Sequence, residues 1–104
     1  MAERLADVVE KVRSKNAGPF WLTIDIFCGT DRAYERVSRT LATPEVARLL
    51  GADTQLVKRF DIAGLNVVKF SLPRPHTQGA VADRDMHGAA WAVLLAEMAL
   101  GETD

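Results

Sequence analysis

The sequence predicts an α+β protein in which helices cover one face of a small antiparallel sheet. Residues 20–28 alternate apolar and polar side chains, as a half-buried strand does. Two more strands are predicted at 58–63 and 65–72, with a turn or bulge at Gly64 between them. Apolar residues recur at helical spacing in three other stretches: 30–42, 43–50 and 86–100. The order strand, helix, strand, strand, helix matches a ferredoxin-like arrangement that lacks or displaces one edge strand.

Length and composition predict one domain over residues 1–104 with a modest core. The chain has 104 residues, of which 48% are hydrophobic and 26% are charged, as in ordinary globular domains. The formal net charge is −1, and neither half of the chain has a strong excess of either sign. This balance gives no support for electrostatic capture of nucleic acid or of an anionic membrane.

The cysteine content and the first residues bear on the cellular compartment. Cys28 is the single cysteine, and its place on the apolar face of a predicted strand indicates a buried, unreactive thiol. The start of the chain carries Glu3 and Asp7 without an apolar run, which is not typical of a signal peptide. No stretch approaches the roughly 20 apolar residues of a membrane-spanning helix. We therefore expect a cytoplasmic protein.

Two structures are open for residues 3–12. Their apolar residues recur at i, i+3, i+4 and i+7, which favours an amphipathic helix: Leu5, Val8, Val9 and Val12. Three of these four are β-branched valines, so a strand is the alternative. Residues 13–18 are polar and contain a glycine, and they predict a loop that leads into the next strand.

The strand at 20–28 is the best-defined element. Its even-numbered residues form an apolar face, and we expect Ile24 and Ile26 to be buried in the core. The opposite face carries Trp21 and Phe27, whose rings need a separate cover. We expect these two rings to lie near a contact with another chain, unless the chain itself covers them.

Asp25 and Lys69 are the charged residues in the middle of two predicted strands. Asp25 shares a face with Thr23, and Lys69 shares a face with Ser71. If the strands pair with these faces aligned, the two charges form a cross-strand ion pair. We favour this structural role for Asp25 over a catalytic one.

Capping residues delimit the first two predicted helices. Thr30 or Asp31 begins the earlier one through a side chain that accepts a backbone N–H. Thr43 caps the next, with Pro44 at its first position, where the missing N–H costs nothing. Gly51 ends it.

Prolines end the strand at 65–72, because proline donates no hydrogen bond to a ladder. The sequence Pro73-Arg74-Pro75 opens a polar loop at 73–84. Asp85 then caps the last helix, and Gly101 follows its end. One apolar stripe of this helix faces the core: Trp91, Leu94, Leu95 and Met98.

The chain contains no motif for a metal, a nucleotide or an acyl-enzyme. His76 and His87 are eleven residues apart, and neither has a second histidine or cysteine at ligand spacing. There is no P-loop, no dinucleotide fingerprint and no serine elbow. We expect neither a metal nor a cofactor.

Three polar clusters are candidate ligand sites. The first has the charged and amide groups that bind a carboxylate or phosphate: Arg13, Ser14, Lys15, Asn16 and Gly18. The second is Arg74, between two prolines and followed by His76. The third is the start of the last helix, where Asp85 and Gly88 flank accessible N–H donors. The alternatives are solvated loops and, for Asp85, a simple helix cap.

These polar segments resemble a known family. The run from Arg13 to Phe20, continued by Leu22-Thr23 and Asp25-Ile26, resembles the opening signature of the domain-of-unknown-function family 4387. Later segments agree in consistent order: Pro73-Arg74-Pro75, and Asp83-Arg84-Asp85 with Gly88-Ala89. That family is similar to the small ferredoxin-fold domain attached to AtuA-like proteins of acyclic terpene utilisation.

The resemblance implies a site and a partner. The AtuA-like domain has an R-S-G-D-K-G loop and an acidic residue with a glycine at its last helix. The residues that match are Arg13, Ser14, Lys15, Gly18, Asp85 and Gly88. Asn16-Ala17 departs from the loop, because its acidic member is absent. Arg13 and Lys15 are expected to lie near the turn at 85–88. The implied function is a small accessory subunit that binds an AtuA-like large subunit in organic-acid or acyl-thioester catabolism and completes its anion-binding site.

A free-standing lyase or hydratase that acts on a carboxylic acid is the alternative function. Its proton transfers would fall to Lys15, Asp25, His76 or Asp85. Against it, 104 residues leave little room for an enclosed pocket. An open sheet edge and exposed rings favour a partner, so we expect a homo-oligomer as well as the large subunit.

Overall fold

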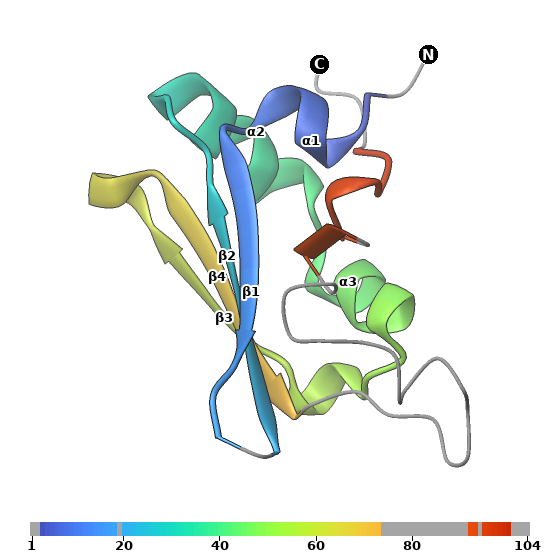
Figure 1. Ribbon diagram of the computed structural model, residues 1–104. Coiled ribbons are helices and arrows are strands. Elements are labelled where there is room, and N and C mark those ends of the chain that lie inside the picture. The colour runs from blue at the N-terminus through green and yellow to red at the C-terminus, as the bar shows by residue number, and fades with distance from the viewer. Residues whose placement is uncertain (1–2, 19, 74–91, 94, 101–104) are drawn as a thin grey trace.

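The computed structural model describes residues 3–18, 20–73, 92–93 and 95–100 (Figure 1). The α-helices are α1 (Leu5–Val8), α2 (Asp31–Thr40) and α3 (Thr43–Leu50). The strands are β1 (Lys11–Asn16), β2 (Trp21–Phe27), β3 (Lys58–Ile62) and β4 (Val67–Pro73), and two 3₁₀ turns are η1 (Thr54–Leu56) and η2 (Ala63–Leu65). No helix within these ranges is long and apolar enough to span a membrane.

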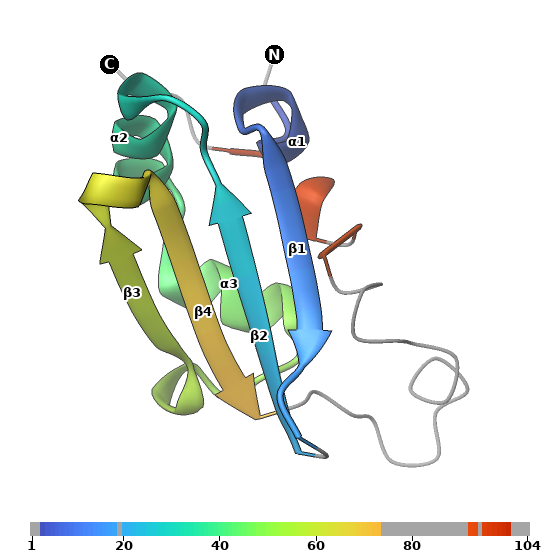
Figure 2. The ribbon, with the colours of Figure 1, turned by 60° about the vertical axis from the view of Figure 1, so that its left-hand side comes forward.

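The four strands form one antiparallel sheet in the order β1-β2-β4-β3. The three α-helices lie on the same side of this sheet (Figures 1 and 2). The predicted α+β class, with helices on one face of a small antiparallel sheet, is therefore confirmed. The ferredoxin-like order is not confirmed by this topology, because β1 runs directly into β2 as a hairpin.

β1 lies where the sequence predicted the end of a helix and most of a loop. The helix predicted at 3–12 was wrong in extent, because α1 ends at Val8 and β1 begins at Lys11. The loop predicted at 13–18 was wrong for its first four residues, which belong to the strand. Pairing with β2 satisfies the backbone groups of this polar run and offsets its weak strand propensity.

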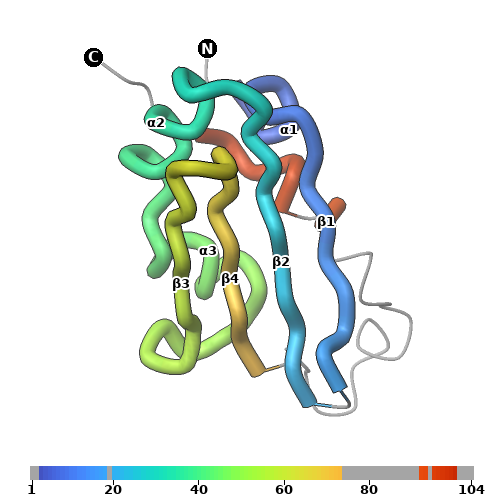
Figure 3. The backbone as a smooth tube through the Cα atoms, turned by 90° about the vertical axis from the view of Figure 1, so that its left-hand side faces the viewer, coloured from blue at the N-terminus to red at the C-terminus, as the bar shows by residue number. Residues whose placement is uncertain are grey.

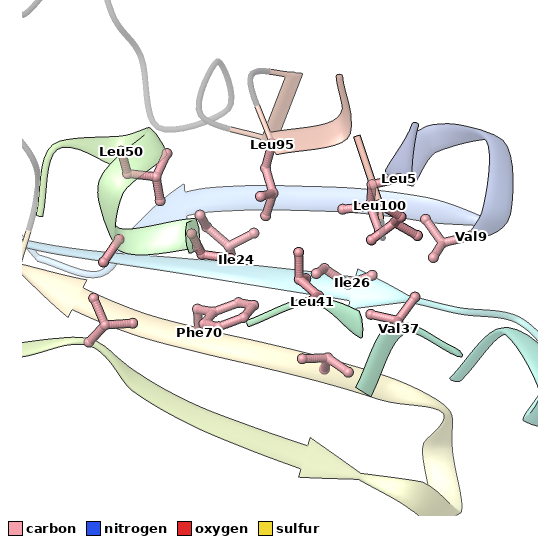
Figure 4. Close-up of a cluster of buried hydrophobic side chains, with 14 of the residues drawn as sticks. Leu5, Val9, Ile24, Ile26, Val37, Leu41, Leu50, Phe70, Leu95 and Leu100 are labelled. Carbon is pink, nitrogen blue, oxygen red and sulfur yellow. The ribbon is translucent and has the colours of Figure 1, made fainter. Parts of the chain in front are cut away.

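The core fills the space between the sheet and the helices (Figure 4). Ile24 and Ile26 of β2 are fully buried, as predicted. β4 contributes the inward face that its alternation predicted, with Val68, Phe70 and Leu72 fully buried. The largest other buried side chains come from the helices and their flanks: Leu5, Val37, Leu41, Val46 and Leu95.

The ends of α2 and α3 follow capping chemistry with one difference from the sequence prediction. Thr30 Oγ1 accepts the Ala33 N–H at 3.1 Å, so the predicted cap of α2 is confirmed. Thr43 was the wrong cap for α3, because Ala42 holds the cap position and Thr43 is already helical. Gly51 ends α3 in the left-handed region at φ 70°, as predicted.

Arg59 of β3 joins the sheet to the end of α2. Its guanidinium donates to the Ser38 carbonyl at 3.0 Å and to the Leu41 carbonyl, both at the C-terminal end of that helix. It also lies 5.7 Å from the centroid of the Phe70 ring and pairs with Asp61 at 2.8 Å. These contacts satisfy carbonyl groups that a helix end leaves without intrahelical partners.

The C-terminal segment closes the fold beside the N-terminus. Leu95 is buried as predicted, whereas Trp91 and Leu94 lie outside the described residues. The helix predicted to run to residue 100 was too long, because Ala99 forms a β-bridge with Arg4. Strand-like hydrogen bonds to the N-terminal residues compete with the last helical turn: Leu5 N–H to Met98 O at 2.8 Å and Leu100 N–H to Glu3 O at 2.7 Å.

A cationic face of the sheet as the candidate functional site

The candidate site is the face of the sheet that turns away from the core. Figure 3 looks onto this face, and the three α-helices lie behind it. Alternation along each strand sends every second side chain to this side. Within the described ranges no helix or strand covers it, so its side chains are available to a ligand or a partner.

A charged row crosses three strands of this face. Arg13 of β1 is registered opposite Asp25 of β2, which is registered opposite Lys69 of β4. The strands do pair with the faces of Asp25 and Lys69 aligned, which was the condition for an ion pair between them. No ion pair within 4 Å joins these side chains in the described part of the chain, so the predicted salt bridge itself is not formed.

A second row places two hydroxyl groups between two lysines. Lys15 lies opposite Thr23, Thr23 opposite Ser71, and Ser71 opposite Lys58. The strands of a sheet are roughly 4.8 Å apart, so the two lysine Cα atoms are on the order of 14 Å apart. Thr23 Oγ1 is buried and has no hydrogen-bond partner among the described residues. Two flexible ammonium groups can therefore converge from opposite sides on an anion above the hydroxyls.

The charge of this face differs from that of the whole chain. Among the residues of the four described strands, five basic and one acidic point to it: Lys11, Arg13, Lys15, Lys58 and Lys69, with Asp25. The chain carries a formal net charge of −1, so the rest of its surface is acidic on balance. A concentration of cations on one side of a near-neutral protein attracts anionic groups to that side.

Aromatic rings lie among the cations. Trp21 and Phe60 are 42% and 49% exposed. The Lys11 ammonium lies 5.1 Å from the centroid of the Phe27 ring, at cation–π distance. The face thus combines ring surface with positive charge, a composition that suits a protein interface with an acidic partner.

Strand alternation divides the first predicted cluster between the two sides of the sheet. Arg13 and Lys15 point to the cationic face, whereas Ser14 is 8% exposed and points to the helix side. Asn16 is registered opposite the buried Leu22, so it also belongs to the helix side, at the end of the strand. Arg13 and Lys15 therefore lie on the opposite side of the sheet from Ser14 and Asn16, and ligand binding by these residues stays a prediction.

Ser14 instead connects β1 to the C-terminal segment. Its Oγ accepts the backbone N–H of Ala92 at 2.7 Å, across 78 residues of sequence. The family resemblance led us to expect Arg13 and Lys15 near the start of the last helix, and Ala92 is the nearest described residue to that start. Asp85 and Gly88 themselves lie outside the described residues, as do Arg74 and His76. Their part in the site stays a prediction.

Gly18 belongs to the turn between β1 and β2. It has a φ of 78°, a conformation that favours glycine over residues with a Cβ. The turn is closed by the Ala17 N–H, which donates to the Trp21 carbonyl at 2.8 Å. Nothing lies within 4 Å of a Cβ built on Gly18. Glycine therefore suits this position because of the backbone conformation of the turn and not because a neighbouring group needs the space.

Within the described residues, neither a metal site nor a reactive thiol accompanies the face. The residues that the structure describes contain no group of three histidine, cysteine or carboxylate side chains placed to hold a metal ion. Cys28 is buried on the other side of the sheet, as predicted. Burial, together with the nearby Asp61 carboxylate, raises the pKa of its thiol to about 11, so it stays protonated near neutral pH.

Sequence reasoning did not identify Thr23, Ser71 and Lys58 as parts of a site. Alternation along each strand could have indicated that these residues share one side of their strand. Alternation alone does not say which residues of neighbouring strands lie opposite one another. The strand order and register were needed to place Lys58 in the same row as Lys15.

Comparison with known proteins identifies the family. A search of curated proteins finds no match, and a search of solved structures also finds none. Residues 5–99 match a family described as a domain of unknown function, DUF4387. The match spans the whole sheet and the described C-terminal residues up to Ala99. The chain therefore belongs to the DUF4387 family.

Proposed function

We propose that this domain is an accessory subunit that docks through its cationic sheet face on an acidic surface of a larger, AtuA-like subunit. In this assembly Arg13 and Lys15 supply positive charge to an anion-binding site of the large subunit. The anion is a carboxylate or an acyl thioester of an organic-acid pathway.

One observation carries the proposal. Five cations, one carboxylate and the exposed rings of Trp21 and Phe60 share a face that no described helix covers. Opposite potentials steer two proteins together and fix their orientation, while aromatic and arginine side chains supply most of the energy at interface centres.

The strand geometry suits a contribution to a shared site. Arg13 and Lys15 are two residues apart on an edge strand, so their charged groups leave the sheet side by side near its rim. A guanidinium binds a carboxylate or a phosphate through two parallel hydrogen bonds, and an ammonium adds a movable point charge. Ser71, in the same register row as Lys15, extends this surface inward.

Co-purification with the AtuA-like large subunit tests the proposal. The double variant Arg13→Glu/Lys15→Glu reverses charge on the cationic face, and we expect it to weaken binding by at least about tenfold, roughly 1.4 kcal/mol. The matched control is Arg39→Glu/Arg48→Glu, which reverses two exposed charges on the helix side and leaves binding within about threefold.

The result that would overturn the proposal is a large subunit that binds the wild-type chain no better than the double variant. Turnover of a carboxylic acid by the purified chain alone would favour the lyase or hydratase alternative, in which Lys15 and Asp25 act from this same face. The assay is run on the chain, on the large subunit and on their mixture.

A further inference from the structure

The outer side of β3 is a free sheet edge within the described part of the chain. β3 pairs with β4 on one side, and the sheet order places no described strand on the other (Figure 3). Such an edge presents unpaired backbone donors and acceptors, which natural proteins either protect or use for association.

Exposed apolar side chains concentrate at this edge. The structure describes seven large hydrophobic residues as exposed, and four of them lie in β3 or in the 3₁₀ turns at its two ends: Leu56, Phe60, Ile62 and Leu65. Leu65 is 71% exposed and Leu56 is 51% exposed. A cluster of this kind along an open strand indicates a contact surface.

The sequence of β3 is complementary to itself. Its five residues are Lys58-Arg59-Phe60-Asp61-Ile62, and opposite charges flank Phe60 symmetrically. If two copies pair antiparallel about Phe60, Arg59 of each copy faces Asp61 of the other, and the two Phe60 rings face each other. Each Arg59–Asp61 pair, already joined at 2.8 Å within its own copy, then lies against the reversed pair of the other copy, which is a charge-complementary contact. Facing aromatic rings are a favourable cross-strand pair as well.

The alignment also preserves the two faces of the sheet. In this pairing, the positions of two residues that lie opposite each other differ by an even number. Side chains at such positions point to the same side of a strand, so facing residues of the two copies lie on the same side of the joined sheet. Phe60 lies in the register row of Lys69 on the cationic face, and Arg59 and Asp61 lie on the helix side. The two sheets therefore join with helices on one side and cations on the other.

The opposite edge of the sheet does not offer this complementarity. β1 carries Lys11, Arg13 and Lys15 on the cationic face. An antiparallel self-pairing of β1 about Arg13 would set these cations against one another, which is destabilising. The charges therefore favour two-fold pairing through β3 and disfavour two-fold pairing through β1.

We propose that two copies of this chain associate through β3 about a two-fold axis at Phe60 and form a continuous eight-stranded antiparallel sheet. The turns at the strand ends come together in pairs, so Leu56 of one copy lies at the same end as Leu65 of the other. The dimer leaves β1 at both outer rims. It does not depend on the proposed large subunit, which would bind the cationic face of each copy.

Sedimentation velocity of the full chain across a concentration series measures the association. We expect a concentration-dependent dimer, and we expect Phe60→Glu to raise its dissociation constant by at least about tenfold, because two carboxylates then meet at the axis. The matched control is Phe20→Glu, the same change at a more exposed phenylalanine beside the β1–β2 hairpin, which leaves the dimer unchanged.

Disulfide trapping tests the register independently. Opposite residues in an antiparallel pair have Cα atoms roughly 4.5–5.5 Å apart, which a disulfide spans, so Phe60→Cys cross-links two copies. Lys58→Cys is the matched control on the same strand and face, where the two positions lie on the order of 14 Å apart and do not cross-link. Buried Cys28 stays reduced in both variants.

A wild-type chain that stays monomeric through the concentration series overturns this inference. A dimer that Phe60→Glu leaves intact, or equal cross-linking at positions 58 and 60, overturns it as well. Circular dichroism of each variant confirms that the fold is retained, and the cysteine variants decide the case if Phe60→Glu does not fold.

Discussion

The thiol of Cys28 shows how burial sets the properties of a single residue. Burial, with the Asp61 carboxylate, raises its pKa from 9.0 to about 11. Because the pKa of the thiol is higher in the folded state than in the unfolded chain, the folded state binds the proton more tightly. The stability that this difference contributes is fully present below pH 9. That stability is lost as pH rises from about 9 toward 11.

Urea unfolding at pH 7, 9 and 10.5 measures this loss. We expect the free energy of unfolding to fall more steeply above pH 9 in the wild type than in Cys28→Ala, which has no thiol to titrate. The difference between the two profiles isolates the contribution of the thiol, including its interaction with Tyr34, whose own pKa is raised by burial and by nearby charges that include Cys28. Parallel profiles would mean that the thiol ionises equally in both states.

Ile24 is the residue on which the packing of β2 depends. It is fully buried between the sheet and the helices, and Figure 4 shows it among side chains from several elements. Ile24→Ala should lower the free energy of unfolding by roughly 2–5 kcal/mol, because the cavity adds to the lost burial. Val93→Ala truncates an exposed aliphatic residue and should cost at most about 0.5 kcal/mol. Chemical denaturation compares the two, and a loss as small as that of the control would make β2 peripheral.

Between elements, one buried hydroxyl holds the C-terminal segment against β1. Ser14 Oγ accepts the Ala92 N–H at 2.7 Å, and Ser14→Ala removes this acceptor. We expect amide exchange at Ala92 to become faster by a factor that corresponds to about 1–3 kcal/mol, since the buried N–H loses its partner.

Hydrogen exchange followed by NMR resolves this amide from the rest of the chain. Ser38→Ala is the control, because its hydroxyl lies on α2 and donates to the Glu35 carbonyl at an exposed site. Equal exchange at Ala92 in both variants would show that another contact holds the segment in place.

The elements differ in how far the sequence could predict them. β2, β4 and α2 were predicted because their apolar pattern matches the period of one structure over the whole element. β1 was missed because its residues are mostly polar and its stability comes from pairing with β2. The burial of Ser14 depends on a segment 78 residues away, and no local pattern contains that information.

At the scale of the whole molecule, the sheet separates the chain into a cationic side and an acidic remainder. Net charge alone gave no support for electrostatic capture of nucleic acid or an anionic membrane, since positive and negative residues nearly cancel along the sequence. The fold sorts them in space. Arg13 and Lys15 were predicted as site residues from their chemistry, whereas their partners Lys58 and Ser71 required the register of four strands.

β1 also limits how the length of this protein can vary. In a strand, one added residue exchanges the two faces for everything on one side of the insertion. An alanine inserted between Arg13 and Ser14 would turn Lys11 and Arg13 toward the core, and we expect soluble expression and cooperative unfolding to be lost. An alanine inserted between Ala17 and Gly18 only lengthens the hairpin turn and should be tolerated.

Insertion scanning with a thermal-melt readout checks this expectation. Equal tolerance at the two sites would show that the hairpin can slip to restore its faces. If the contrast holds, insertions and deletions in this family are confined to the turn, and the spacing from Lys11 to Asn16 is fixed even where the residues themselves change.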